Sequence, residues 1–223
     1  MSLGQCRNAT MELLRHCMEE FSSHGINHAL KVEHVALDIF NHEKNSIVDK
    51  EEIFCEKIVQ TSALLHDITD KKVKNSEANK PKLDSFLKNA KLFSNLEARY
   101  INWIIDHVSY SKEKKYGIPT AEVSATCLKL RDIVSDADKI DAIGYEGTMR
   151  CILYQKEHFL PSDPLVDYVI QHHHDKLLKL APLYIRTDRG KEIAEPLHAE
   201  MVKSCQWLEK YHRFPESINE FNT

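Results

Sequence analysis

The stretch "SALLHDITDKK", residues 62–72, ends an apolar run on a histidine and a carboxylate. Residues 63–65 are apolar and predict the end of a buried helix, yet His66 and Asp67 follow at once. Adjacent residues on a helix point about 100° apart, so these two side chains do not share one ordinary solvent-facing surface. The residues alone allow two interpretations. Either the helix reaches water here, or the pair binds a metal ion at the helix end.

Composition places this stretch in an all-α protein. The chain has 223 residues, of which 42% are hydrophobic and 29% charged, so it is long enough to bury a core as a single domain, residues 1–223. Only 6 glycines and 7 prolines interrupt it, and clusters of strand-forming residues are few. We therefore expect a single-domain helical fold.

Several classes of function are disfavoured by what the chain lacks. No apolar stretch approaches the ~20 residues needed to cross a bilayer, and no signal-peptide core precedes the first helix. The six scattered cysteines form no CxxC pair, so we expect reduced, buried thiols in the cytoplasm. A net charge of −4 without a basic block argues against a nucleic-acid polymer as partner.

Helical periodicity recurs along most of the chain. A polar stretch at residues 69–82 follows the quoted motif and is interpreted as a loop over an open site. The helices predicted around it cover residues 6–24, 28–40, 51–68, 83–92, 95–109, 121–135, 138–157, 164–180 and 188–212.

Further metal donors lie at two other places in the chain. His28 comes early in a predicted helix, and Asp136, Asp138 and Asp141 lie where one predicted helix gives way to the next. Two histidines with two carboxylates form a mixed nitrogen and oxygen set, which suits Mn, Fe, Co, Ni or Zn better than Ca. Such a set leaves coordination positions open for water or substrate, as a catalytic metal requires.

The order of these residues resembles the HD-domain metal-dependent phosphohydrolase superfamily, in particular its small single-domain hydrolase branch. The similarity spans about residues 28–202. The segments that carry it are "HALKV" (28–32), "ALLHDITDKK" (63–72), "IIDHVSYS" (104–111), "SDADKIDAIGYEGTMR" (135–150) and "KLLKLAPLYIRTDRGKEIAEPLHAEM" (176–201).

The resemblance implies one divalent metal ion, with Mn, Mg, Fe, Co, Ni and Zn as candidates, held by His28, His66, Asp67 and Asp138. It also implies a helical HD-type domain with core motifs at about 28–150, whose pocket is completed by C-terminal helices at about 164–212. Lys139 stands where the superfamily often has arginine, as does Lys31. Lysine keeps the charge but loses bidentate geometry.

Three further residues are candidates for catalysis. Asp70 comes four residues after His66 and is predicted to orient or deprotonate the attacking water; the alternative is an exposed loop acid. Lys72 is predicted to contact phosphate, or else to be a solvated loop lysine. His107 matches a segment of the superfamily and is predicted to line the pocket; the alternative is a core histidine bonded to a carbonyl.

Substrate binding is assigned to Lys31 and to one face of a C-terminal helix. His172, Lys176 and Lys179 fall at i, i+4 and i+7 and correspond to the pattern of the superfamily, although a solvated face has the same appearance. His173 and His174 lack that support and are interpreted as surface residues. Asp141 and Arg150 are predicted to pair and to support the segment around Asp138.

These expectations combine into a metal-dependent hydrolase of phosphoric esters or phosphoanhydrides. Its substrate would be a small phosphorylated metabolite or a nucleotide, and the nucleophile a metal-activated water. A non-catalytic metal- or nucleotide-binding sensor module is the alternative from another class. A di-iron oxygenase of the HD type is disfavoured, because it needs about two further histidines between Asp67 and Asp138, where only His107 occurs. The sequence does not set the oligomeric state.

Overall fold

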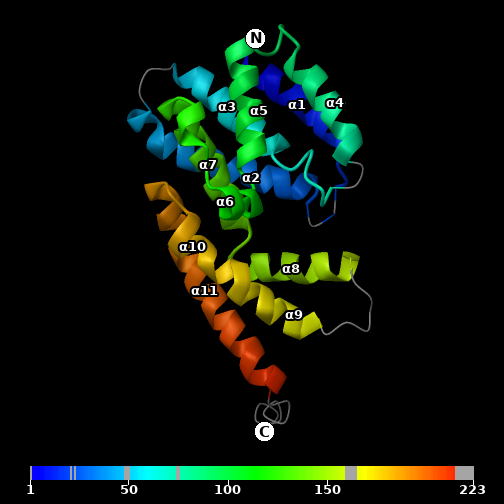
Figure 1. Ribbon diagram of the computed structural model, residues 1–223, viewed down its shortest axis with the longest axis vertical. Coiled ribbons are helices and arrows are strands. Elements are labelled where there is room, and N and C mark those ends of the chain that lie inside the picture. Colours follow the sequence, from blue (N-terminus) through cyan, green and yellow to red (C-terminus); the bar gives the residue numbers. More distant parts are fainter. Residues whose placement is uncertain are drawn as a thin grey trace. The chain divides into compact units, whose positions relative to one another are not determined.

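The computed structural model describes residues 2–20, 22, 24–47, 51–73, 76–158 and 165–213. Within these ranges all regular structure is helical and no strand occurs, which confirms the predicted all-α class (Figure 1). Over the same residues, no helix is both long and apolar enough to cross a membrane. The chain divides into two compact units, one of residues 1–138 with 186–190 and the other of residues 139–185 with 191–223. The expected single domain stays a prediction.

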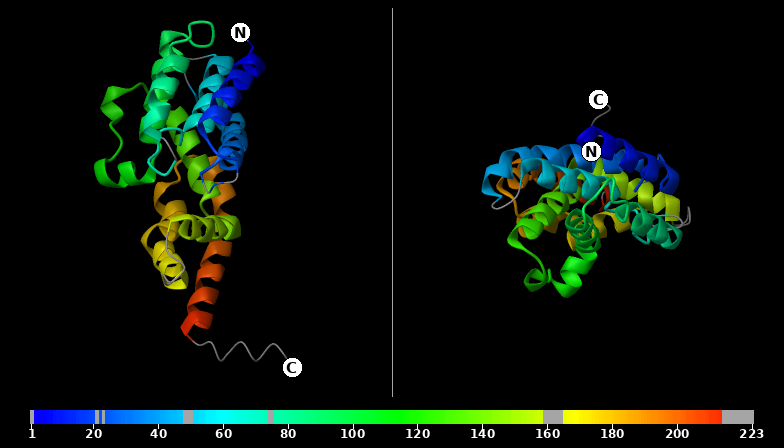
Figure 2. Two further views of the ribbon diagram at one scale, coloured as in Figure 1. Left: turned by 90° about the vertical axis from the view of Figure 1, so that its right-hand side faces the viewer. Right: turned by 90° about the horizontal axis from the view of Figure 1, so that it is seen from above.

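Helix α3 (Glu52–Leu65) lies at the centre of the first unit. It packs against α1 (Leu3–Cys17), α2 (Ile26–Glu43) and α5 (Asn95–His107), and both Figure 1 and Figure 2 show these helices side by side. The apolar run 63–65 at its end has no exposed surface, as predicted. The remaining elements of this unit are η1 (Lys44–Ser46), α4 (Ser76–Leu87), α6 (Tyr110–Tyr116), η2 (Thr120–Glu122) and α7 (Ala125–Asp141), the last turn of which enters the second unit.

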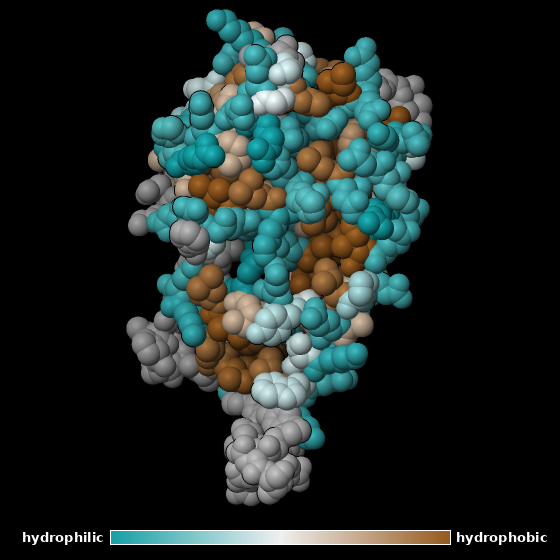
Figure 3. Space-filling view, turned by 180° about the vertical axis from the view of Figure 1, so that it is seen from behind, coloured by the Kyte–Doolittle hydropathy of each residue, from teal (hydrophilic) through white to brown (hydrophobic). Residues whose placement is uncertain are grey.

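The second unit consists of α8 (Gly144–His158), α9 (Leu165–His172), the π-helical turn η3 (His173–Leu177), α10 (Leu178–Tyr184) and most of α11 (Asp188–Arg213). Helix α8 packs against α9, and η3 joins α9 to α10. On the face of the molecule in Figure 3, hydrophilic side chains predominate and apolar patches lie between them.

The loop predicted at residues 69–82 is too long, because α4 already begins at Ser76. Asn79 explains the difference. This polar residue is buried and donates its side-chain amide to the carbonyls of Cys17 and Ile68, at 3.2 and 3.1 Å. A polar segment that looked solvated therefore forms a helix that fastens the turn after α3.

The predicted break at residues 135–138 is also wrong. Helix α7 runs through to Asp141, and the chain turns only before Gly144, whose φ of 76° favours glycine. Asp136 looked like a solvated break but is fully buried and bonded. Helix α6 was not expected, since its sequence "YSKEKKY" is polar; it is anchored by Glu113, which is buried against Arg131. The first helix ends at Cys17, well before residue 24.

Candidate metal centre

The first part of the site is built at the start of α2. Gly25 is the N-cap of this helix, and a Cβ at this position would lie 2.3 Å from the carbonyl oxygen of Glu19, so only glycine fits the close approach of the chain. The amide of Ile26 donates to the same carbonyl at 2.9 Å. This tight entry places His28 in the first turn of α2, where its side chain is buried.

The quoted motif supplies the second part. His66 is the C-cap of α3, and its Nδ1 lies 2.8 Å from the carbonyl oxygen of Ala63. Because a carbonyl only accepts, Nδ1 carries the proton and Nε2 of the neutral ring is left with a lone pair. The buried run 63–65 holds the backbone, and the bond to Ala63 orients the ring. A metal-binding histidine is oriented in the same way by the partner of its other nitrogen.

Helix α7 supplies the third part. Asp136 and Asp138 are two residues apart, so they point roughly 200° apart around the helix. Oδ2 of Asp136 accepts hydrogen bonds from the backbone amides of Arg186 and Thr187 and from the Thr187 hydroxyl, at 2.9, 2.7 and 2.8 Å. Asp138 faces the histidines instead. The two aspartates of one motif thus perform separate tasks, one structural and one at the site.

Four donor atoms converge where these parts meet. Nε2 of His28 lies 3.1 Å from Nε2 of His66, and each nitrogen lies 3.4–3.6 Å from Oδ2 of Asp67 and from Oδ1 of Asp138. Atoms bound about 2.1 Å from one ion lie roughly 3.0 Å apart at right angles and roughly 3.4 Å apart at tetrahedral angles. The separations of the two nitrogens from each other and from each carboxylate oxygen are close to these values, and His28, His66 and Asp138 form one group of donors with metal-like spacing.

The charges at this cluster point the same way. Burial alone would lower the pKa of His66, but the carboxylates of Asp67 and Asp138 raise it well above its ordinary value. Burial would raise the pKa of Asp67, but His66 and the bonds to His24 and His28 hold it well below its usual range. The pKa of Asp138 is likewise lowered against its burial by bonds to His28 and His66. The cluster stabilises positive charge, which a proton or a metal ion can supply.

His24 is a site residue that the sequence analysis missed. Its Nδ1 lies 2.8 Å from Oδ2 of Asp67, and its ring packs edge-on against that of His28. His24, His28 and Asp67 also form a group of donors with metal-like spacing. The signal in the sequence is the H-x-x-x-H spacing of His24 and His28 across Gly25. The first predicted helix extended through residue 24 and hid it.

Comparisons with known proteins agree with this architecture, although no family model matches the chain. The uncharacterized protein YpgQ of Bacillus subtilis is 27% identical in an alignment of 202 positions that covers 86% of this chain and 86% of that protein. A solved structure of YpgQ in complex with ADP has a TM-score of 0.64 at 25% identity and covers 90% of this chain and 96% of that one.

Two further solved structures have the same architecture. A Lactobacillus plantarum protein has a TM-score of 0.73 at 24% identity, covering 94% of this chain and 97% of that one. An HD-superfamily hydrolase of Bacillus thuringiensis has a TM-score of 0.62 at 22% identity, covering 96% and 100%. The chain has the HD-superfamily fold. This confirms the resemblance at the level of the fold.

On this HD fold, the three predicted catalytic residues lie outside the two groups of donors at the site, as far as the described residues show. Asp70 is half-buried in the turn after α3, where its Oδ1 accepts the backbone N–H of Lys72 at 3.0 Å. The Lys72 side chain is exposed. His107 ends α5, with Nδ1 2.7 Å from the carbonyl oxygen of Trp103 and its ring stacked on that indole. The catalytic roles of all three stay predictions.

The predicted substrate-binding face needs a correction. Lys31 is exposed on α2, three residues after His28. His172 ends α9, and Lys176 lies within η3, where the amide of Leu178 bonds to the carbonyl of His173 five residues back. A π turn takes about one residue more than an α turn, so Lys179 does not follow His172 at an α-helical i+7 position. The expected α-helical spacing of His172, Lys176 and Lys179 is therefore wrong, whereas the substrate-binding roles of these residues and of Lys31 stay predictions.

The remaining predictions divide. His173 is fully buried, against the surface position predicted for it, and its ring bonds to Val169 and Thr148, whereas His174 is exposed as predicted. Arg150 does pair with Asp141 at 2.5 Å and also donates to its carbonyl, so the pair fastens the end of α7. Lys139, one of the two departures from the superfamily, is fully buried.

Proposed function

We propose that this protein is a metal-dependent phosphohydrolase that acts on a nucleotide or another small phosphorylated metabolite. The observation that carries the proposal is the cluster of Nε2 of His28, Nε2 of His66, Oδ2 of Asp67 and Oδ1 of Asp138, in which the nitrogens lie 3.1 Å apart and each lies 3.4–3.6 Å from both carboxylate oxygens. The fold of the B. thuringiensis hydrolase and the ADP complex of YpgQ support the choice of chemistry and of ligand class.

The protein's own residues supply positioning and charge. His66 is held in one tautomer by the carbonyl of Ala63, and Asp67 is held by His24. His28 and His66 are almost fully buried, whereas the side chains of Asp67 and Asp138 remain 13% and 26% exposed, so the carboxylates form the accessible side of the cluster. Any substrate phosphate would approach from that side. A divalent cation bound there acts as a Lewis acid and lowers the pKa of water towards ~7.

Asp70 and Lys72 are our candidates for proton transfer and for binding phosphate. Both follow the motif in the same turn, and their roles are part of the proposal. Lys31, one helical turn after His28 and exposed, is the third candidate, because residues three apart are neighbours on a helix. A lysine near a phosphate offsets the negative charge that spreads over it during transfer.

The test is a screen of nucleotides, sugar phosphates and diphosphates with Mn²⁺, Mg²⁺, Co²⁺ or Ni²⁺, with release of phosphate as the readout. Metal-dependent turnover is expected in the wild type, and Asp67→Ala should abolish it. The matched control is Asp38→Ala, because Asp38 is an exposed carboxylate on α2 that pairs with Arg189. A metal-loaded wild type that binds nucleotide tightly but hydrolyses none of these esters would refute the hydrolase and favour the sensor module.

A further inference from the structure

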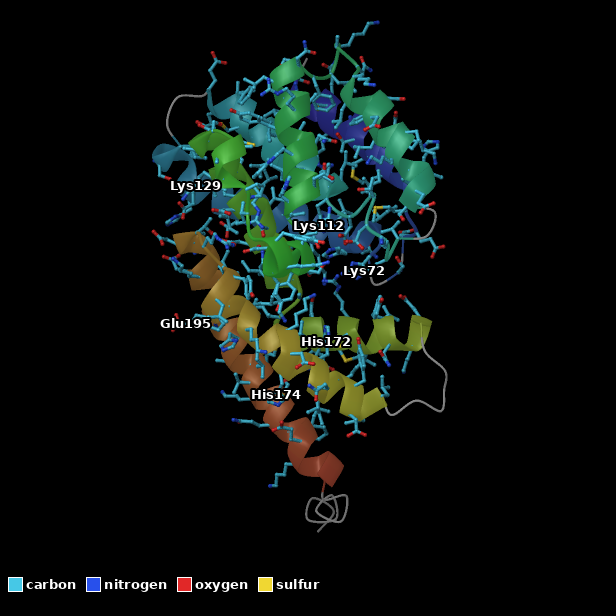
Figure 4. All side chains as sticks on the ribbon, in the orientation of Figure 1. Lys72, Lys112, Lys129, His172, His174 and Glu195 are labelled. Atoms are coloured by element: carbon cyan, nitrogen blue, oxygen red, sulfur yellow. The ribbon has the colours of Figure 1, made fainter. Side chains whose placement is uncertain are left out.

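A second cluster of metal-type donors lies in the second unit, between η3 and α11. Nε2 of His174 lies 2.6 Å from Oε1 of Glu209 and 3.8 Å from Sγ of Cys205. The three donor atoms lie within 4.8 Å of one another. Cys205 and Glu209 are four residues apart on α11 and so share one face of it. Figure 4 labels His174, which these contacts place beside α11.

His174 lies within the π turn η3. His173 is buried, with its ring against Val169 and Thr148, so it occupies the inward side of the turn. His174, the next residue, points to a different side and reaches Cys205 and Glu209. Inserted π turns are uncommon and are often found at functional sites. The turn thus brings an imidazole to a thiol and a carboxylate.

We propose that His174, Cys205 and Glu209 bind a thiophilic divalent cation, with Zn²⁺ and Co²⁺ as the suitable ions. A thiolate, an imidazole and a carboxylate are all zinc ligands, and three protein ligands leave one position for water. Nitrogen and sulfur at about 2.05 and 2.3 Å from one tetrahedral ion lie roughly 3.5 Å apart. The observed separation of 3.8 Å needs only a small adjustment.

The surroundings of the three residues suit entry of an ion from solvent. The side chain of His174 is 51% exposed and that of Glu209 is 30% exposed, whereas Cys205 is buried behind them. The His174–Glu209 contact of 2.6 Å is a hydrogen bond, which the ion would replace after the carboxylate moves back by under about 1 Å. An ordinary surface ion pair accounts for that contact, but it does not account for a thiol facing the same nitrogen.

Without a cation, Cys205 is held in the protonated thiol form. Burial, and then the negative charge of Glu209, raise the pKa of Cys205. Binding of a cation therefore displaces the thiol proton into solvent as the sulfur–metal bond forms. The sulfur ligand also gives this site a sulfur-to-metal charge-transfer band with Co²⁺, which the cluster of His28, His66, Asp67 and Asp138 cannot give because it contains no sulfur.

The experiment is a titration of the full chain with Co²⁺, observed as the near-ultraviolet sulfur-to-cobalt charge-transfer band. We expect a band that rises to saturation as Co²⁺ is added and that Zn²⁺ removes by competition. Cys205→Ala should abolish it, and Cys151→Ala should leave it unchanged, because Cys151 is a half-buried thiol of the same unit outside the cluster. Absence of the band in the wild type, or its persistence in Cys205→Ala, would overturn the proposal.

Because Cys205 is buried and its substitution could disturb folding, two more variants test the site at less buried positions. His174→Gln and Glu209→Gln alter the exposed donors, and we expect each to weaken Co²⁺ binding at least tenfold while circular dichroism stays unchanged. Unchanged affinity in both would also refute the site. Asp67→Ala should keep the band, so the outcome does not depend on the proposed hydrolase activity.

Discussion

The two aspartates of the D-A-D motif should respond to substitution in opposite ways. Asp136 is fully buried, and its Oδ2 accepts three hydrogen bonds that hold residues 186 and 187 against α7. Hydrogen bonds to a charged group contribute about 1.5–3 kcal/mol each, and removing one partner of a buried charged set costs about 3–5 kcal/mol in total. Asp136→Ala should therefore lower the free energy of unfolding by about 3–5 kcal/mol. In a chain of this size that lowers the Tm by about 6–20 °C.

Asp138→Ala should show the reverse pattern. This side chain is 26% exposed and contacts the two histidines, so the metal-free protein should lose under about 1 kcal/mol, while affinity for Mn²⁺ falls by at least about 100-fold. Urea denaturation in the presence of a chelator measures the first quantity, and equilibrium dialysis measures the second. Thr187→Val is an intermediate control, because it removes one hydroxyl and should cost about 1–2 kcal/mol. Equal destabilisation by both alanine variants would refute the assignment of a structural role to Asp136 and a metal-binding role to Asp138.

Three further predictions concern residues around the site. His24→Ala should raise the dissociation constant for Mn²⁺ by about 10–100-fold, measured by equilibrium dialysis, because Asp67 loses the ring that orients it; an unchanged constant would count against that role. Arg131 is fully buried and donates to Glu113, so Arg131→Ala should cost about 3–5 kcal/mol in urea denaturation, and a loss below 1 kcal/mol would contradict this. The lowered pKa of Glu43 means that its stabilisation is present above its unfolded value near 4.5 and is lost as the pH falls through the folded value; Glu43→Gln should flatten the stability profile measured from pH 6 to pH 3, and parallel profiles would refute this.

The helical class follows from local patterns in the sequence, whereas the set of candidate site residues came from the resemblance to the HD superfamily. The apolar run 63–65 predicts a buried helix end, and its burial is complete. The structure also brings His28, His66, Asp67 and Asp138 together, although metal binding itself stays a prediction. Order along the chain was sufficient here because the HD resemblance supplied the tertiary relation between distant segments.

The errors in predicting helix boundaries and site residues have a common physical cause. Hydrogen bonds to partners far away in the sequence allow polar residues to be buried where the local pattern predicts a solvated loop. Asn79 and Asp136 looked like loop residues, but each is buried because it bonds to backbone groups 11 to 62 residues away. Periodicity within one segment does not contain those partners. The π turn after His172 and the bond from His24 to Asp67 depend on packing in the same way.

The ligands of the proposed metal site are oriented by bonds that do not involve a metal. The carbonyl of Ala63 fixes the tautomer of His66, and His24 holds Asp67. The bonds of Asp136 fix the rotation of α7, and hence the side to which Asp138 points. A site prepared in this way loses little conformational entropy on binding. Addition of Mn²⁺ should therefore leave the far-ultraviolet circular dichroism unchanged while the Tm rises. At a free Mn²⁺ concentration of one hundred times the dissociation constant, binding adds about 2.7 kcal/mol to the free energy of unfolding. A gain of helix on binding would show instead that the metal organises the site.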